Sequence, residues 1–251
     1  MIERTINHGR GLGAALAVFG TLVCLLAAPA TSLAASPRIQ ARPRPNTEWV
    51  AAILYKAPAH VAPLRSSRVS LNIRPTTEWG TPNELLVLDT AKDARGETWL
   101  HVEFDHRPNG YARWIESRFV YLWVDPWSIV VSRPARTISI YRYGVRRRWA
   151  KVVVGKPSTP TPGGLFAIAA ELLQASPQEF TGSWIMPLTA HSNVLDNYGG
   201  GPGRIAIHGR DGASLLDPLG TARSHGCIRI NNNWVVFLAT HVPRGTPVLV
   251  D

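Results

Sequence analysis

The residues that could do chemistry are a cysteine, two histidines and two polar neighbours near the carboxyl end. They lie within RIAIHGRDGASLLDPLGTARSHGCIR, residues 204–229, where fifteen residues separate the first histidine from the second serine. A cysteine accepts an acyl group as its thiolate, and an imidazole within reach takes the thiol proton and later protonates the leaving amine. The segment predicts a cysteine–histidine acyl-transfer site made of His208, Ser224, His225, Cys227 and Arg229.

The backbone around this cysteine is rich in glycine. Residues 205–207 are an apolar run typical of a buried strand, which would deliver His208 to the end of a sheet. Gly226 permits a tight turn beside Cys227. We expect the N–H groups of Gly226 and Cys227 to face the oxyanion that develops during acyl transfer.

The rest of the chain predicts two β modules that position this segment. In residues 47–123, apolar and polar residues alternate at period two between Asn-Gly and Arg-Gly turns, which indicates hairpins in a small barrel. A second module is expected over 124–251, where Asn231, Asn232 or Asn233 would cap a short helix. Its strands are predicted at 128–131, 137–143, 149–155, 165–169 and 246–250.

The composition is that of a basic, turn-rich globular chain. Of 251 residues, 45% are hydrophobic, which is enough for a substantial core and excludes a fibre or a disordered tail. Lys and Arg number 27 against 17 Asp and Glu, a net charge of +10, so an acidic partner is expected.

The first 35 residues have the parts of a secretory signal peptide. Arg4 and Arg10 precede an apolar run over 12–28, and small residues follow it. The alternative is a retained membrane anchor, since the run is close to the minimum length of a span. Residues 36–46, SPRIQARPRPN, predict a Pro-rich spacer. The segment predicts export, which we expect to place the protein in the cell envelope, in the periplasm or cell wall, and nucleic acid is not expected as a partner.

The two cysteines lie in different parts of the chain and are expected to have different roles. Cys24 lies in the apolar run and leaves with a cleaved signal, so Cys227 is alone and no internal disulfide can form. Three alternatives to a nucleophile are a buried structural cysteine, a thiol that pairs with another molecule, and a zinc ligand beside His225 and either His208 or His191. Zinc sites commonly carry a second Cys pair, which this sequence lacks, so we expect no metal.

Four segments resemble the L,D-transpeptidase catalytic domain, the YkuD family of cell-wall enzymes. They are VGKPSTPTPGGLFAI, IAIHG, GTARSHGCIRI and RGTPVLV, and the match covers about half the chain, residues 127–251. The resemblance implies a mainly β fold, a β-sandwich with one or two short helices. The segment GETWLHVEFDHRPNGYARWIESRFV resembles bacterial SH3-like domains, which implies an SH3-like β-barrel over 47–123.

The family resemblance also assigns roles to the site. It implies that Cys227 is the nucleophile, His208 the general base and the carbonyl of Gly209 the group that orients the imidazole. His225 is expected in the same catalytic set and, with Arg229, would shape the pocket and contact the stem peptide. Ser224 is expected to support the loop by a hydrogen bond.

The activity implied by the resemblance is peptidoglycan cross-linking. Cys227 would attack the carbonyl of the third residue of a tetrapeptide stem, release the terminal D-Ala, and pass the acyl group to a neighbouring stem as a 3-3 cross-link. Water as acceptor would give an L,D-carboxypeptidase, and a degenerate site would leave a wall-binding protein. No metal or diffusible cofactor is needed. Sensitivity to carbapenems, which acylate such cysteines, is also implied.

Three further features invite a functional interpretation. His191 and Ser192, in LTAHSN, resemble the family segment that lines the donor cleft. The glycines of 199–203 are expected to form a flexible flap beside the cleft. The arginines of 146–148 indicate either a solvated strand edge or a contact for anionic wall polymers.

Overall fold

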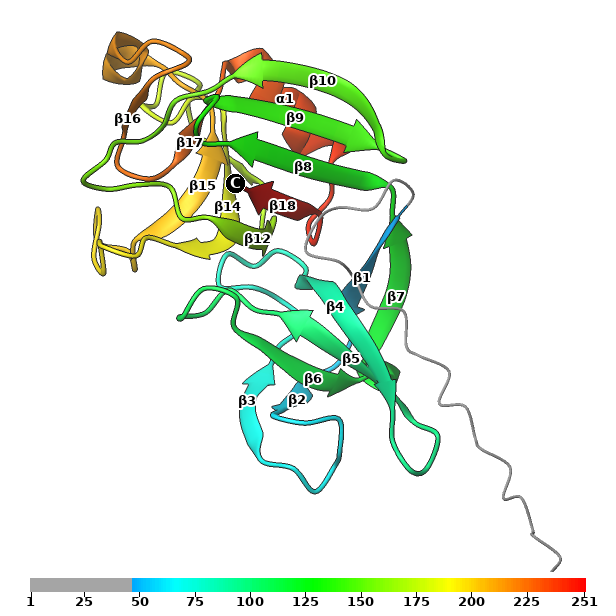
Figure 1. The fold of residues 1–251 in the computed structure, drawn as a ribbon. Coiled ribbons are helices and arrows are strands. Elements are labelled where there is room, and N and C mark those ends of the chain that lie inside the picture. The colour runs from blue at the N-terminus through cyan, green and yellow to red at the C-terminus, as the bar shows by residue number, and fades with distance from the viewer. Residues whose placement is uncertain (1–46) are drawn as a thin grey trace, which may run out of the picture. The chain divides into compact units, whose positions relative to one another are not determined.

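The computed structural model describes residues 47–251, so the predicted signal peptide (1–35) and spacer (36–46) lie outside the described residues. The described part is mainly β, as the sequence predicts, and has one α-helix (Figure 1). No helix within residues 47–251 is long and apolar enough to cross a membrane.

The first seven strands form one antiparallel sheet in the order β3-β2-β6-β5-β4-β1-β7. Alternation along these strands places one set of side chains in a common core, which includes Ala51, Leu100, Val102 and Ile115. The SH3-like assignment of this module stays a prediction. Its elements are β1 (Glu48–Ile53), β2 (Ala57–His60), β3 (Val69–Ile73), β4 (Glu84–Lys92), β5 (Thr98–Glu103), β6 (Ala112–Glu116), the 3₁₀ helix η1 (Ser117–Phe119) and β7 (Val120–Asp125).

The remaining strands form two larger sheets and one small one. The five-stranded sheet has the order β10-β9-β8-β18-β12, the four-stranded sheet β13-β14-β15-β17, and β11 pairs with β16. These elements are β8 (Trp127–Ser132), β9 (Thr137–Arg142), β10 (Val145–Lys151), β11 (Val154–Gly155), β12 (Gly164–Ala167), β13 (Leu172–Leu173), β14 (Trp184–His191), β15 (Arg204–His208), the 3₁₀ helix η2 (Gly212–Leu216), β16 (Ala222–Ser224), β17 (Ile228–Arg229), α1 (Asn232–His241) and β18 (Pro247–Val250).

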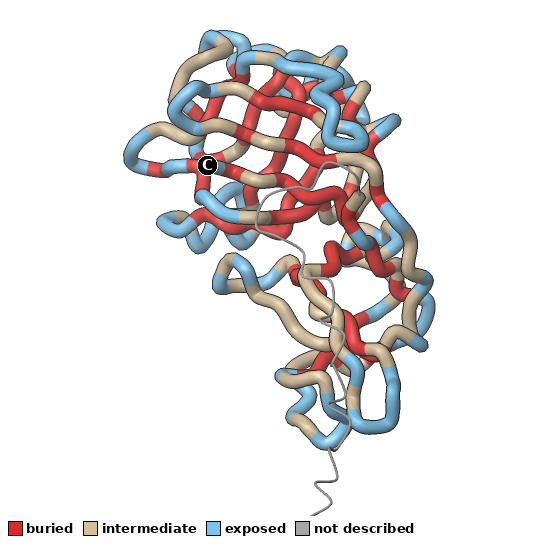
Figure 2. Tube along the Cα trace, turned by 45° about the vertical axis from the view of Figure 1, so that its right-hand side comes forward, coloured by how far each residue is buried: buried red, intermediate tan, exposed pale blue. Residues whose placement is uncertain are grey.

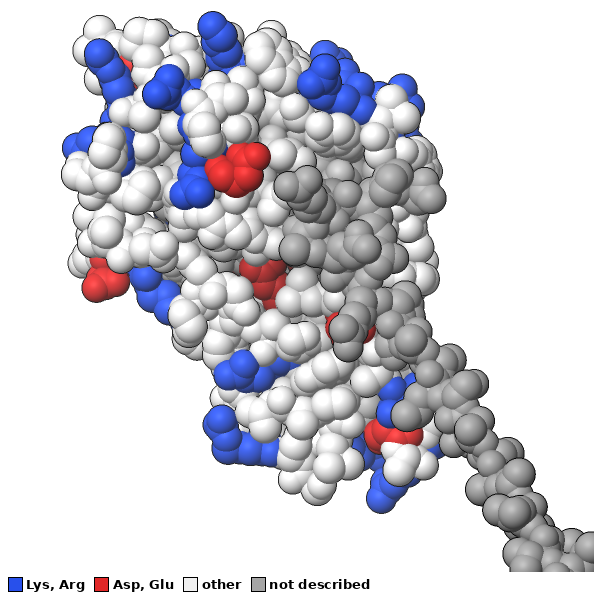
Figure 3. All heavy atoms as spheres, viewed as in Figure 1, with Lys and Arg blue, Asp and Glu red and all other residues white. Residues whose placement is uncertain are grey.

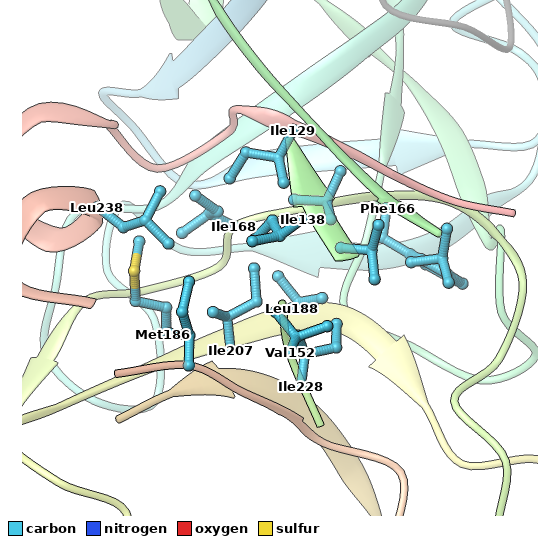
Figure 4. Packing of buried hydrophobic residues seen from close by; sticks show 14 of the residues in the cluster. Ile129, Ile138, Val152, Phe166, Ile168, Met186, Leu188, Ile207, Ile228 and Leu238 are labelled. Atoms are coloured by element: carbon cyan, nitrogen blue, oxygen red, sulfur yellow. The ribbon is translucent and has the colours of Figure 1, made fainter. Parts of the chain in front are cut away.

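Buried apolar side chains of the larger sheets pack on one another (Figure 4). Ile129 and Ile138 come from the five-stranded sheet, Met186 and Ile207 from the four-stranded one, and Leu238 from α1. Buried residues are concentrated along the strands and exposed ones at the turns (Figure 2). Burying one such side chain stabilises the fold by roughly 1.5–3 kcal/mol. Ile205 and Ile207 therefore hold β15 in this core.

The strand expected over 149–155 is two strands that belong to different sheets. β10 ends at Lys151, and β11 begins at Val154 and pairs with β16. Between them the N–H of Val152 donates to the carbonyl of Arg136 at 2.9 Å. Val153 pairs with Arg229 in both directions, at 3.0 and 2.9 Å. The chain therefore passes from one sheet to another at residues 152–153. The pairing of Val153 with Arg229 also holds β17, the strand that follows Cys227.

The helix starts where the sequence predicts but is not capped as expected. Asn231 occupies the N-cap position, yet its side chain makes no capping hydrogen bond. The side chain of Asn232 instead accepts from the N–H of Arg210 and donates to its carbonyl, each at 3.1 Å. A Cβ at Gly209 would collide with this amide, so the close approach requires glycine. The amide thereby ties the segment after β15 to the helix.

Candidate active site

A cleft of about 530 Å³ opens where β15 and β17 end. His208, Cys227 and Arg229 line it, together with His225 and Ser192. Its other lining residues are mostly apolar or glycine: Trp79, Leu172, Phe180, Thr181, Ile185, Pro187, Leu195, Tyr198, Gly199, Gly201, Gly203, Arg204, Ile205 and Ala206. An apolar cleft with few convergent polar groups is typical of a small-molecule or peptide site.

The pairing of β15 with β17 brings the expected nucleophile and base to one face. The strands are parallel, with Ile207 opposite Ile228 and His208 opposite Arg229. Directly paired residues share a face, and side chains alternate along a strand, so Cys227 lies on the same face as Arg229 and His208. The histidine and the cysteine both line this one cleft.

His208 is buried and held in one tautomer. Its Nδ1 lies 2.7 Å from the carbonyl oxygen of Gly209, which can only accept, so Nδ1 carries the proton and Nε2 is left as a base. Burial lowers the pKa of His208 to about 4, hydrogen bonds to the backbone of Gly209 and Thr181 oppose that shift, and the charge of Arg229 adds to it. The imidazole is therefore neutral near pH 7, the form that accepts a proton.

Cys227 is a free, partly exposed cysteine in the cleft. Its Sγ donates to the carbonyl of Arg204 at 3.9 Å. Burial of the thiol raises its pKa, while a backbone hydrogen bond from Ala206 and the charge of Arg229 act in the opposite direction. The resting side chain is accordingly a protonated thiol.

The loop before the cysteine is held by buried hydroxyl groups. Ser224 donates its Oγ–H to the carbonyl of Cys227 at 2.6 Å and accepts from the N–H of Gly226 at 3.1 Å. The hydroxyl of Thr161 donates to the carbonyl of Gly226 at 2.7 Å. Gly226 has a φ of +125°, and a Cβ there would press on Ile205, so only glycine fits. Its N–H, expected to face the oxyanion, is already bound to Ser224.

Arg229 lies beside the cleft as a paired cation. Its Nη1 donates to Asp217 at 2.6 Å, and its guanidinium lies 4.9 Å from the centre of the Phe180 ring. The residue is 5% exposed, and Nε has no hydrogen-bond partner within the described residues. A buried guanidinium with a free donor is suited to a carboxylate or carbonyl of a ligand.

His225 lies at the rim of the cleft rather than beside the base. Its ring stacks on Tyr198 at 5.2 Å, and its Nδ1 lies 3.2 Å from the Tyr198 hydroxyl. Nε2 lies 3.4 Å from the ammonium of Lys156. Burial lowers the pKa of His225, and the charges of Lys156 and Arg229 add to this. The geometry is that of a cleft wall.

His191 and Ser192 were both expected to line the cleft, and this expectation is wrong for His191. Its Nε2 lies 3.4 Å from Asp105, its N–H and carbonyl both pair with the side chain of Asn109 at 2.8 Å, and it does not line this cleft. As the last residue of β14 it is covered by the amino-terminal module. Ser192, the next residue, does line the cleft.

Several cleft residues were not predicted from the sequence: Trp79, Phe180, Tyr198 and Arg204. Asp217, the ion-pair partner of Arg229, was not predicted either. Trp79 and Phe180 come from segments far from the cysteine motif, and no spacing connects them to it. Tyr198 adjoins the glycines of the predicted flap, which is the one signal that could have found it. Within residues 47–251, no three His, Cys, Asp or Glu side chains are grouped so that they could hold a metal ion.

A β-sandwich with a cysteine and a neutral histidine on one cleft floor has the parts of a thiol-dependent acyl-transfer site. The model of the L,D-transpeptidase catalytic domain, YkuD, matches residues 126–250. The chain therefore belongs to the L,D-transpeptidase catalytic domain family, through its carboxyl-terminal half.

Two curated relatives agree with this membership. The YkuD protein of Bacillus licheniformis is 34% identical over 125 residues, and that of Bacillus subtilis is 32% identical over 126 residues. Each alignment covers 50% of this chain and 66% of the relative, so neither spans the whole of either protein.

Solved L,D-transpeptidases are also similar. The catalytic domain of the Enterococcus faecium enzyme is 25% identical, with 50% of this chain and 96% of that chain covered and a TM-score of 0.38. An L,D-transpeptidase from Mycobacterium smegmatis is 18% identical, with 82% of this chain and 98% of that chain covered and a TM-score of 0.40.

Proposed function

We propose that this protein is an exported peptidoglycan L,D-transpeptidase that forms 3-3 cross-links through a thioester on Cys227. The observation that carries the proposal is the Gly209–His208 hydrogen bond. It leaves Nε2 of a neutral imidazole as the base on the cleft floor that holds Cys227. Family membership supplies the substrate class, the peptide stem of the cell wall.

In the first half-reaction the thiol of Cys227 turns from the Arg204 carbonyl toward His208 and gives its proton to Nε2. Sulfur attacks the carbonyl carbon of the third stem residue and forms a tetrahedral intermediate. The imidazolium then protonates the amine of the terminal D-Ala as the amide bond breaks. The products are free D-Ala, a thioester and a neutral imidazole, so atoms and protons balance.

In the second half-reaction the side-chain amine of a neighbouring stem attacks the thioester. His208 removes the proton of the amine and returns it to the departing sulfur, which regenerates the thiol. Water in place of the amine gives L,D-carboxypeptidase activity by the same steps.

The positive charge of Arg229 at the cleft favours an acyl donor that carries a negative charge. The terminal D-Ala of a tetrapeptide ends in a carboxylate, and Arg229 is a buried cation at the cleft with an unpartnered Nε within the described residues. Because Ser224 occupies the N–H of Gly226, the N–H of Cys227 is the backbone group we propose for the oxyanion.

The basic edge strand supports a location in an acidic envelope. β10 is exposed along nearly its whole length and carries Arg146, Arg147 and Arg148. Figure 3 shows Lys and Arg gathered along the margin where β10 lies. We propose that this edge contacts anionic wall polymers, such as phosphate-rich chains. The attraction between the arginines and the phosphates would be strongest at low ionic strength.

The direct test of the proposed function is incubation of the purified protein with a disaccharide tetrapeptide, followed by mass spectrometry. We expect release of D-Ala and a cross-linked dimer, both lost in Cys227→Ala. Released D-Ala with hydrolysed stem and no dimer would assign the L,D-carboxypeptidase alternative. No product and no thioester with a carbapenem would leave the wall-binding alternative and overturn the enzyme proposal.

A further inference from the structure

The glycine-rich loop between β14 and β15 forms one wall of the catalytic cleft but has few hydrogen bonds of its own. The N–H of Ser192 donates to the carbonyl of Gly203 at 2.7 Å and closes the base of the loop. Tyr198 and Gly201 pair with each other at 2.9 and 3.1 Å at its tip. The Oγ of Ser192 also accepts from the N–H groups of Val194 and Leu195 at 3.3 and 3.1 Å. A loop with few such bonds can open locally at small cost, so contacts from outside the loop can stabilise its position.

That outside support is Arg107, from the amino-terminal module. Its Nη1 donates to the carbonyl of Ser192 at 2.8 Å, and its Nη2 donates to the carbonyls of Leu195 and Pro202 at 3.1 and 2.9 Å. One planar guanidinium thus joins both arms of the loop. A lysine could not reproduce this, because its donors radiate from a single nitrogen.

The neighbouring Asn109 fixes the start of the same loop. Its amide accepts from the N–H of His191 and donates to the carbonyl of His191, each at 2.8 Å. The amide therefore continues the backbone pairing of β14 at the point where the strand leaves its sheet.

A second attachment joins the module to the strand that carries the base. Arg204, the first residue of β15, pairs with Asp105 at 2.7 Å and Glu78 at 2.6 Å, and its guanidinium lies 4.7 Å from the centre of the Trp79 ring. The carbonyl of the same Arg204 accepts from the Cys227 thiol. Trp79 itself lines the catalytic cleft.

We infer that the amino-terminal module is a structural part of the catalytic cleft and that Arg107 is a positioning residue that holds the glycine-rich loop against it. The loop carries Tyr198 to the His225 side chain and so sets the width of the cleft where a peptide would lie. The inference rests on the proposed function for its substrate, but the clamp itself concerns the resting protein.

The test compares three variants of the full chain by hydrogen–deuterium exchange and by turnover. In Arg107→Ala, exchange of amides in 193–203 is expected to rise about tenfold or more, since charged donors to three carbonyls are lost. Exchange in β8 and β9 is expected to stay as in the wild type. Arg107→Lys should behave like the alanine variant, and Arg95→Ala, an exposed arginine of the same module, should change nothing.

Turnover separates positioning from a general structural role. For Arg107→Ala we expect KM for the tetrapeptide to rise about tenfold with kcat changed far less. Unchanged exchange in 193–203, or a rise spread equally over β8 and β9, would overturn the inference. If the wild type releases no D-Ala, the proposed function fails, while the exchange comparison still decides whether Arg107 holds the loop.

Discussion

The hydroxyl of Ser224 donates to the backbone carbonyl of Cys227 at 2.6 Å, so the residue that carries the thiol is held by its own loop. The same oxygen accepts from the N–H of Gly226 at 3.1 Å. Ser224 is fully buried, and one hydroxyl therefore fixes the peptide group after Cys227 and the peptide group between His225 and Gly226.

Removal of this hydroxyl is expected to loosen the nucleophile. In Ser224→Ala a buried carbonyl and a buried N–H lose their partner, which costs about 1–3 kcal/mol of stability. Thermal unfolding measures this cost, and kcat for D-Ala release should fall about tenfold at a temperature where the variant is folded. Wild-type turnover in a folded Ser224→Ala would contradict a positioning role.

The base is predicted to be His208 and not His225. His208→Ala should abolish acylation by a carbapenem, because among residues 47–251 His208 is the buried imidazole that lines the cleft, whereas His225 is exposed at the rim. His225→Ala is the matched control, since it removes a rim imidazole that stacks on Tyr198, and it should acylate at a rate within about tenfold of wild type. Circular dichroism checks folding, and retained acylation in His208→Ala would make His225 the base.

The pH dependence of acylation should reflect a base with an unusually low pKa. Burial lowers the pKa of His208 to about 4, so the neutral imidazole persists as pH falls and is lost only through that value. The rate of acylation is therefore expected to stay level from about pH 8 to 5 and to decline near 4. A decline centred near pH 6.5 would show an imidazole unaffected by burial.

The resting thiol is predicted to react slowly with alkylating agents. Burial raises the pKa of Cys227, so its thiolate is scarce near neutral pH. Alkylation by iodoacetamide, followed at this residue by peptide mass spectrometry, should be slower than that of free cysteine and should rise with pH beyond about 9. Rapid alkylation that is independent of pH from about 6 upward would indicate a preformed thiolate.

Stability is expected to fall with rising pH because of a buried carboxyl between the modules. Glu103 is 1% exposed and accepts from the hydroxyl of Thr189 at 3.0 Å, and burial raises its pKa to about 8. The folded state then binds more protons than the unfolded state between about pH 4.3 and 8, so the free energy of unfolding decreases through that window. Glu103→Gln should raise Tm by about 2–4 °C at pH 8, and it should raise Tm much less at pH 5. An identical pH dependence of Tm in the variant would exclude Glu103 as its source.

The cysteine motif and the mainly β class could be predicted because both are local patterns. Spacing connected His208 with Cys227, and apolar patterning located β8, β9, β12, β15 and β18 within a few residues. The pairing of Gly209 with His208 was likewise expected from the family resemblance and is present at 2.7 Å.

What the sequence did not predict depends on contacts between distant segments. His191 resembled a cleft residue, but Asn109 and Asp105 hold it on the side of the amino-terminal module. Arg107 has no motif around it, and its role follows only from the three carbonyls that the fold brings to it. Asn231 holds the expected N-cap position without a side-chain capping bond, and the side chain of Asn232 bonds Arg210 across the fold, a contact that no local pattern indicates.

The intact mass of the full chain after brief incubation with a disaccharide tetrapeptide tests the central proposal most directly. We predict a covalent adduct equal to the disaccharide tripeptide acyl group, mapped to Cys227, together with one free D-Ala for each adduct. An adduct on any other residue, or D-Ala released at the wild-type rate by Cys227→Ala, would contradict the account.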